Sequence, residues 1–154
     1  MTMATVTDEG IEMCSVRVGE TLFGVPITGI LEILDKPATR QVPLAPPHIG
    51  GLVHYRGEIL TAVSLRSLLG LPSHAQPPDM LVFEGRDGYF GLLVDSVGEV
   101  LTVSPREFEP SPSILDERKR ALFAGACKLS GSLLVMLDPG SFDPVQLSQV
   151  LLPQ

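Results

Sequence analysis

The feature that most constrains the fold of this chain is a pair of apolar runs joined by a two-residue loop. Residues 50–66 carry the pattern of strand, tight turn, strand and helix start, and the turn is Arg56-Gly57. A Gly-containing loop of this length between strand-like runs indicates a β-hairpin. Arg56 would be held on a stiff turn, where its cationic side chain can reach a partner. The alternative is that Arg-Gly only fills the loop, and the loop taken alone favours that interpretation.

Most of the remaining chain consists of short strand-like runs separated by Gly and Pro. Alternating or apolar runs of strand length occur at residues 14–18, 21–25, 80–84, 89–95, 97–103, 123–129 and 133–137, with a weaker one at 38–42. About ten short strands with turns between them predict an all-β fold of barrels or a sandwich. The last two runs flank Ser130-Gly131 and are typical of a hairpin.

Three segments carry helical signals instead. Apolar residues follow the i, i+3, i+4, i+7 spacing over residues 27–34, with Pro26 suited to the first helical position. Ser64 is a good cap for a short helix ended by Gly70, and Asp143-Pro144 is a helix start. The buried stripe predicted for the last helix is Leu147, Val150 and Leu151.

The length of 154 residues is typical of one domain with a substantial core. We expect a tail at residues 1–10 and a single domain at 11–152, which ends in a helix at about 143–152. A Pro-rich linker at 71–79 would divide the domain into β-rich halves at about 11–70 and 80–142. The predicted shared core contains Leu52, Ile59, Val63, Leu92 and Val94.

Composition excludes several classes of function. The formal net charge of −7 opposes binding to nucleic acid, which depends on Lys and Arg neutralising phosphates. No apolar run approaches the roughly 20 residues of a membrane helix, so we expect no membrane insertion. The first residues have neither the basic region nor the apolar stretch of a signal peptide.

Residue patterns that would indicate catalysis are also missing from the sequence. The three histidines, His48, His54 and His74, lack metal-binding spacing, and there is neither a nucleophile elbow nor a phosphate-binding loop. Cys14 and Cys127 are interpreted as buried thiols in a reducing cytoplasm, although the sequence leaves a disulfide open. We therefore expect no catalytic residue, no metal and no cofactor. Asp95 is interpreted as a turn carboxylate that accepts from local backbone N–H groups.

Four blocks, taken in order, resemble the CheW family of bacterial chemosensory coupling proteins. They are residues 21–27, 30–33, 51–66 and 89–101, and the resemblance extends over about residues 11–142. The third block matches the family at Arg56, Gly57, Leu65 and Arg66, but it departs from the usual Asn, Pro and Asp at His54, Thr61 and Ser64. The resemblance implies two small SH3-like five-stranded β-barrels that share a core.

The resemblance also implies a function. The chain would be a non-enzymatic cytoplasmic adaptor that holds the histidine kinase CheA, through its CheW-like regulatory domain, on the cytoplasmic tips of chemoreceptors. The receptor-binding residues implied are Glu32, Ile33, His54, Tyr55, Arg56 and Gly57. Residues that bind the kinase stay unassigned. Two alternatives remain open, namely a generic SH3-like protein-binding module and a β-barrel that binds a small ligand.

Overall fold

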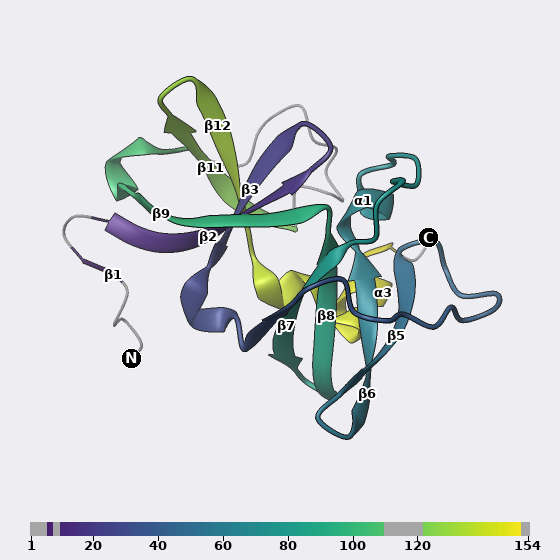
Figure 1. The fold of residues 1–154 in the computed structure, drawn as a ribbon. Helices are drawn as coiled ribbons and strands as arrows, with labels where there is room; N and C mark the ends of the chain where they lie inside the picture. Colours follow the sequence, from purple (N-terminus) through teal and green to yellow (C-terminus); the bar gives the residue numbers. More distant parts are fainter. Residues whose placement is uncertain (1–5, 8–9, 110–121, 152–154) are drawn as a thin grey trace.

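The chain folds into two β-sheets that pack against each other, with short helices at their margins (Figure 1). The computed structural model describes residues 6–7, 10–109 and 122–151. The two strands of the Arg56-Gly57 hairpin are β5 (Ile49–Tyr55) and β6 (Glu58–Ser64), as the sequence predicted. The mainly β fold expected from the sequence is confirmed.

The first sheet, which we call sheet A, is built from the two ends of the described chain. Its strand order is β1-β2-β3-β12-β11-β10, and β9 pairs with β2. Antiparallel hairpins β2–β3 and β11–β12 meet through the parallel pair β3 and β12. The bounds are β1 Val6–Thr7, β2 Gly10–Val18, β3 Thr21–Pro26, β9 Ser96–Val103, β10 Phe108–Glu109, β11 Phe123–Leu129 and β12 Ser132–Leu137.

The second sheet, sheet B, comes from one continuous stretch of sequence. Its order is β4-β7-β8-β6-β5, and the hairpins β5–β6 and β7–β8 again meet through a parallel pair, here β6 and β8. Its other strands are β4 (Glu32–Leu34), β7 (Asp79–Gly85) and β8 (Gly88–Val94). Both sheets therefore repeat one arrangement, although the sequence shows no clear internal repeat.

Strand pairing does not follow the predicted division at residues 71–79. Strands β4, β5 and β6 precede that segment, β7 and β8 follow it, and all five belong to sheet B. Prolines in the segment correctly indicate a loop, but a loop signal carries no information about which strands pair across it. The division lies instead at the ends of sheet B. In the predicted tail, Val6–Thr7 pairs with β2, whereas residues 1–5 and 8–9 lie outside the described part.

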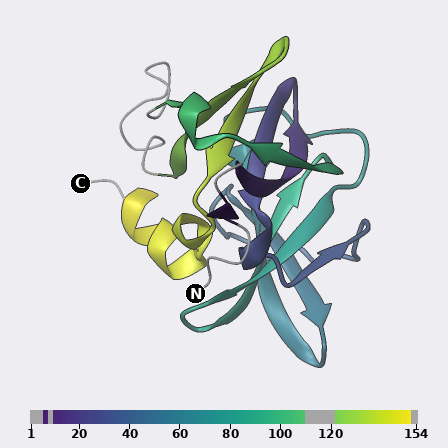
Figure 2. The ribbon, with the colours of Figure 1, turned by 90° about the vertical axis from the view of Figure 1, so that its left-hand side faces the viewer.

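A large apolar core joins the two sheets. Side chains from the inner faces of both sheets meet there, together with side chains of the C-terminal segment. Figure 2 shows this C-terminal segment, in yellow, beside the sheets. Smaller clusters fill the inside of each curved sheet, one in sheet B and one in sheet A. The shared core consists of Cys14, Val16, Val18, Phe23, Val25, Val63, Leu65, Leu68, Leu81, Phe83, Phe90, Leu92, Val94, Leu122, Phe123, Val135, Leu137, Phe142 and Leu147.

Two residues predicted for this core lie elsewhere. Val63, Leu92 and Val94 are buried in it as expected, but Leu52 is only half-buried and Ile59 is 62% exposed. Ile59 pairs with His54 across the hairpin, and the neighbouring strand positions Tyr55 and Leu60 point into sheet B instead. When the rest of the fold covers only part of one face of a strand, a run of apolar residues in the sequence does not show which side chains face inward.

The predicted helix over residues 26–34 is wrong. The segment contains a short 3₁₀ turn, η2 (Ile27–Gly29), followed by strand β4. The N–H of Leu31 donates to the carbonyl of Val82, and Ile33 pairs with Leu81 of β7. Pairing with the edge of sheet B satisfies these backbone groups, so tertiary context overrides the helical spacing. The weak strand predicted at 38–42 is reduced to one bridge between Arg40 and Leu52.

Two predicted helix starts are confirmed. The hydroxyl of Ser64 accepts from the N–H of Ser67 at 3.1 Å and caps α1 (Leu65–Leu68). Asp143 Oδ1 accepts from the N–H of Val145 at 3.0 Å where α3 (Pro144–Leu151) begins. Of the stripe predicted for α3, Leu147 is buried, and the side chains of the other two residues lie outside the described set. Two more 3₁₀ turns are η3 (Pro105–Glu107) and η4 (Pro139–Phe142).

A polar joint lies at the margin of the shared core. Asp95 follows β8, and its Oδ2 accepts from the N–H of Gly19 at 2.8 Å and from Arg66 Nη1 at 2.7 Å. Gly19 is in the β2–β3 turn of sheet A, so Asp95 links the sheets through partners distant in sequence. The prediction of local bonding for Asp95 was therefore wrong. The Arg66 and Asp95 side chains are only 18% and 13% exposed.

We expect Asp95→Ala to lower the free energy of unfolding by about 2–3 kcal/mol, because Arg66 and the Gly19 N–H lose a common, mostly buried acceptor. Urea denaturation measures the loss. Asp95→Asn keeps a neutral acceptor for Gly19 and should lose less. The double variant Arg66→Met/Asp95→Leu should lose less unfolding free energy than the Arg66→Met and Asp95→Leu variants lose in sum. If the two losses simply add, Arg66 and Asp95 are not coupled.

Candidate functional site

The loop that carries Arg56 is a tight turn with a demanding backbone. Arg56 has φ 51° and Gly57 has φ 79°, so both central residues lie in the left-handed region. Two-residue hairpins with positive φ at both positions match the twist of their strands, and they favour Asn or Gly. A Cβ built on Gly57 would meet no atom within 4 Å, so the need for glycine there is conformational. An Arg at the first position is costly for the turn.

The turn meets the far edge of its own sheet at Glu32. Tyr55 Oη donates to Glu32 Oε1 at 2.9 Å, and Arg56 Nη2 donates to the same oxygen at 3.3 Å. Glu32 begins β4 and Tyr55 ends β5, and these are the two edge strands of sheet B. The carboxylate therefore joins the edges of the sheet and closes it on itself at this end.

Tyr55 is the buried member of this cluster. Its ring packs edge-on against Tyr89 with centroids 5.1 Å apart, and the Arg56 guanidinium lies 5.4 Å from the ring centroid. Burial, followed by the hydrogen bond to Glu32, raises the pKa of the Tyr55 phenol above its ordinary value. The phenol therefore stays protonated at neutral pH and remains the donor to Glu32.

Arg56 is the exposed member. Its side chain is 70% exposed, and that of Glu32 is 39% exposed. The hydrogen bond to Glu32 raises the pKa of Arg56, so the guanidinium is charged throughout the physiological range. One Nη2 contact to Glu32 leaves further N–H donors of the planar group directed to solvent. The cluster can therefore hold Arg56 in place and still offer it to a partner.

Exposed aliphatic side chains lie close in sequence to the residues of the cluster. Ile33 is 46% exposed beside Glu32, Leu31 is 49% exposed before it, and Ile59 follows the turn. His54 is exposed and lies opposite Ile59 in the hairpin register. The family resemblance implied Ile33 and His54 as site residues, whereas Ile59 was predicted to lie in the core. The pairing of Ile59 with a polar His across a two-residue loop could have indicated an outward position.

The structure also bears on the chemistry expected of the chain. Among the described residues, no group of His, Cys, Asp and Glu is arranged to hold a metal ion. Cys14 and Cys127 are free and buried, as predicted, and burial is the main cause that raises the pKa of both thiols. Within the described part of the chain, no helix is long and apolar enough to span a membrane.

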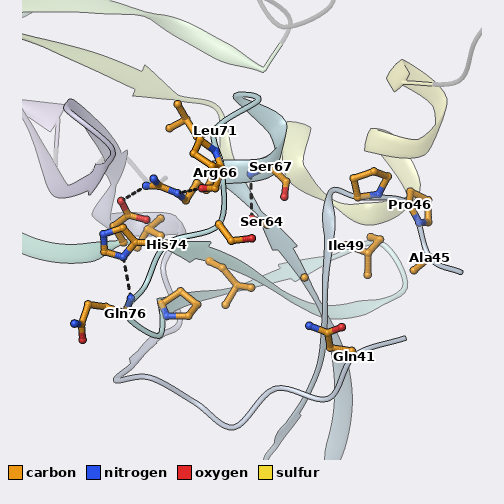
Figure 3. A pocket seen from close by; sticks show the side chains of 18 of the residues that line it. Gln41, Ala45, Pro46, Ile49, Ser64, Arg66, Ser67, Leu71, His74 and Gln76 are labelled. Atoms are coloured by element: carbon orange, nitrogen blue, oxygen red, sulfur yellow. Dashed lines mark hydrogen bonds and ion pairs between the residues drawn. The ribbon is translucent and has the colours of Figure 1, made fainter. Parts of the chain in front are cut away.

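Two surface hollows lie away from the Arg56 cluster. One of about 360 Å³ is mainly apolar, and its lining includes Leu22, Phe23, Leu69, Phe123 and Leu133 together with the charged residues Arg17 and Glu20. The other, of about 380 Å³, lies between two Pro-rich segments (Figure 3). Neither is the interior of a sheet, since side chains fill those interiors. The arrangement does not favour a barrel that encloses a small ligand.

Comparisons with known proteins agree with the fold. The CheW-like domain family matches residues 12–142. The chain is 30% identical to chemotaxis protein CheW of Rhizobium meliloti (strain 1021) over 142 residues, which cover 90% of this chain and 91% of that protein. It is 29% identical to protein FrzA of Myxococcus xanthus over 98 residues, covering 62% and 61% of the two chains.

A solved structure shows the same fold. Scaffolding protein TtCheW from Thermoanaerobacter tengcongensis superposes with a TM-score of 0.76 at 21% identity, covering 86% of this chain and 92% of that chain. The protein thus has an SH3-like fold of two sheets with a shared core. It belongs to the CheW-like family, whose chemotaxis proteins are not enzymes.

We expect Arg56→Asn to change Tm by less than about 2 °C, because Asn tolerates the left-handed backbone and the lost ion pair is exposed. Thermal unfolding followed by circular dichroism measures this. Tyr55→Phe is the informative comparison, since it removes the buried donor to Glu32 and should lower Tm by more. If Arg56→Asn were the more damaging change, Arg56 would be a structural residue of the turn.

Proposed function

We propose that the chain is a cytoplasmic adaptor that couples the cytoplasmic tips of chemoreceptors to the histidine kinase CheA. The observation that carries this proposal is an exposed cation held on a closed, rigid sheet edge within a chain of the CheW-like family. In this proposal the adaptor reaches the membrane only through receptor arrays. Many weak contacts of this kind would add up to a stable assembly.

The receptor-binding surface in this proposal comprises Glu32, Ile33, His54, Tyr55, Arg56 and Gly57. Gly57 and Tyr55 shape the turn, Glu32 fixes the guanidinium, and Arg56 and Ile33 present charge and apolar area to the partner. An Arg beside aromatic and aliphatic side chains is a frequent interface anchor. Neither Glu32 nor Arg56 lines the apolar hollow, so a receptor helix would contact the sheet end rather than enter that hollow.

The kinase-binding surface in this proposal depends on exposed aliphatic side chains. Leu31, Ile59, Val100 and Leu133 are each at least 41% exposed, and they lie on strands or beside them in both sheets. The chain has 11 basic and 18 acidic residues, so a mainly electrostatic interface with an acidic partner is unfavourable. We place apolar contact at the centre of the kinase interface and charges at its rim.

The test of the receptor surface is Arg56→Glu. We expect receptor-coupled kinase activation to fall at least tenfold, on the order of one hot-spot residue, because the new carboxylate repels Glu32 and inverts the presented charge. The assay combines purified adaptor, CheA and receptor tip fragments in a phosphorylation measurement. Arg106→Glu is the matched control, since Arg106 is also exposed but lies on η3, which directly precedes β10 of sheet A. Equal losses in both variants would contradict a specific role for Arg56.

The test of the kinase surface is a binding titration with the CheA regulatory domain at low and high salt. Exposed charges are screened beyond about 8 Å at physiological ionic strength, whereas apolar contact is not weakened in that way. We expect the dissociation constant to change modestly with salt and to rise at least tenfold in Ile59→Ser, as for an anchor residue. A collapse of binding at high salt, with Ile59→Ser unaffected, would show that charges hold the complex.

A further inference from the structure

The two sheets are equivalent strand by strand, and this equivalence aligns two halves of the sequence. In each sheet two antiparallel hairpins meet through a parallel pair, and one more strand lies beside the first hairpin. That strand is β9, beside β2, in sheet A and β4, beside β7, in sheet B. Residues 13–34 thus align with residues 80–101 without a gap, and residues 49–64 align with residues 123–138. The structure supplies this alignment, because few of the aligned residues are identical.

Backbone conformation at aligned glycines supports the equivalence. Gly51 and Gly125 have φ 143° and 149°, and each lies at the register shift of its hairpin. Gly57 and Gly131 have φ 79° and 80°, and each is the second residue of its two-residue loop. The turn Arg56-Gly57 of sheet B therefore has a counterpart in sheet A at Ser130-Gly131.

The small apolar clusters inside the two sheets are built from the same aligned positions. The pairs that contribute to both clusters are Met80 and Met13, Val53 and Cys127, Leu60 and Leu134, Ala62 and Met136, Leu34 and Leu101, Tyr89 and Leu22, and Tyr55 and Leu129. Each sheet can thus be compared with the other, residue by residue, as a version of one scaffold.

The comparison isolates what is particular to the Arg56 end of sheet B. Glu32 aligns with Glu99, so a carboxylate is common to both sheets. Three other positions carry an aromatic or cationic side chain in sheet B and an aliphatic or small polar one in sheet A. They are Tyr55 and Leu129, Arg56 and Ser130, and Tyr89 and Leu22. Sheet A forms without the two tyrosines and the arginine, so the scaffold itself does not require them.

Tyr89 supports Tyr55 from the centre of sheet B. It is the second residue of β8, which lies between β7 and β6, whereas Tyr55 ends the edge strand β5. The two rings meet edge-on, with centroids 5.1 Å apart and an angle of 88° between the ring planes. Edge-to-face pairs of this kind are favourable beyond the area that they bury. A central strand therefore fixes the position of a ring at the sheet edge.

Tyr55 passes this constraint on to both charged groups of the cluster. Its hydroxyl donates to Glu32 Oε1 at 2.9 Å, and its ring lies 5.4 Å from the Arg56 guanidinium. Arg56 is 70% exposed and has one contact to that same carboxylate oxygen, at 3.3 Å. A displacement of the Tyr55 ring would thus disturb both contacts of the guanidinium.

We propose that Tyr89 is a positioning residue of the Arg56 surface and acts on Arg56 through Tyr55. The inference rests on the proposed function, in which Arg56 binds a partner, and adds a residue distant in sequence from that surface. Tyr89 is 33 residues from Arg56 and is half-buried against the cluster inside sheet B. Leu22 at the aligned position shows that this scaffold accepts leucine there, so the ring serves the Arg56 surface.

The first test titrates Tyr55 in the adaptor alone. The chain has two tyrosines and no tryptophan, so substitution of Tyr89 leaves Tyr55 as the single phenol in an ultraviolet absorbance titration. Tyr89→Phe keeps the ring, and the pKa of Tyr55 should remain above its ordinary value because burial is retained. Tyr89→Leu should admit water to Tyr55 and lower its pKa toward the ordinary value. Identical titration curves for the two variants would overturn the proposal.

The second test measures receptor-coupled kinase activation in the assay used for Arg56→Glu. Tyr89→Leu should lower activation about threefold to tenfold, in keeping with the strength of one aromatic pair, and Tyr89→Phe should match the wild type. In an Arg56→Asn background, Tyr89→Leu should cause little further loss, because the side chain that Tyr89 positions is gone. Full additivity of the two losses would mean that Tyr89 acts apart from Arg56, and it would overturn the proposal.

Leu22→Ala is the matched control for a general loss of stability. Leu22 has the position of Tyr89 in sheet A and packs against the cluster of that sheet. The variant should lower Tm at least as much as Tyr89→Leu does and should leave activation unchanged. Equal losses of activation in the two variants would make Tyr89 a structural residue only. If Arg56→Glu keeps full activation, the proposed function fails, whereas the titration of Tyr55 still decides whether Tyr89 positions that ring.

Discussion

The shared apolar core is the constraint on which the rest of the structure depends. Each sheet fills its concave side with its own cluster, but its other face would be open to water without the opposing sheet. Burying these two faces together is worth roughly 25 cal/mol per Å² of apolar surface, and no other contact between the sheets approaches that sum. The Arg66–Asp95 joint and the packing of Leu147 then fix how the sheets meet.

The Arg56 cluster, the recognition surface of the proposed function, shares parts with the fold. Glu32 closes sheet B through Tyr55 while it holds Arg56, so the same carboxylate oxygen serves the architecture and the exposed cation. In that proposal the guanidinium would lose little entropy on binding, because the turn and the ion pair already restrict it. Backbone strain at this turn is consistent with a residue retained for binding rather than for folding.

Local sequence signals predicted the local structure, and they failed where long-range pairing determined the conformation. The hairpin at Arg56-Gly57 and the Ser64 cap depend on neighbouring residues, and both were predictable. The segment at 27–34 has a helical period, yet the edge of β7 pairs with it as a strand. Asp95 has the local sequence of a turn carboxylate, but its partners are 76 and 29 residues away. Candidate site residues could be predicted from the resemblance. That the Glu32 carboxylate accepts from both Tyr55 and Arg56 could be seen only in the three-dimensional structure.

The connectivity of the sheets has a consequence for synthesis of the chain. Sheet B is encoded without interruption between β3 and β9, so all of its strands have been translated before sheet A can pair β2 with β9 or β3 with β12. Strands β2 and β3 must wait as an isolated hairpin, which is marginally stable in water. Vectorial folding on the ribosome would thus proceed from the middle of the chain outward. Pairing of the earliest and latest synthesised strands of sheet A would complete the molecule, and this step has a high contact order because those strands are far apart in the sequence.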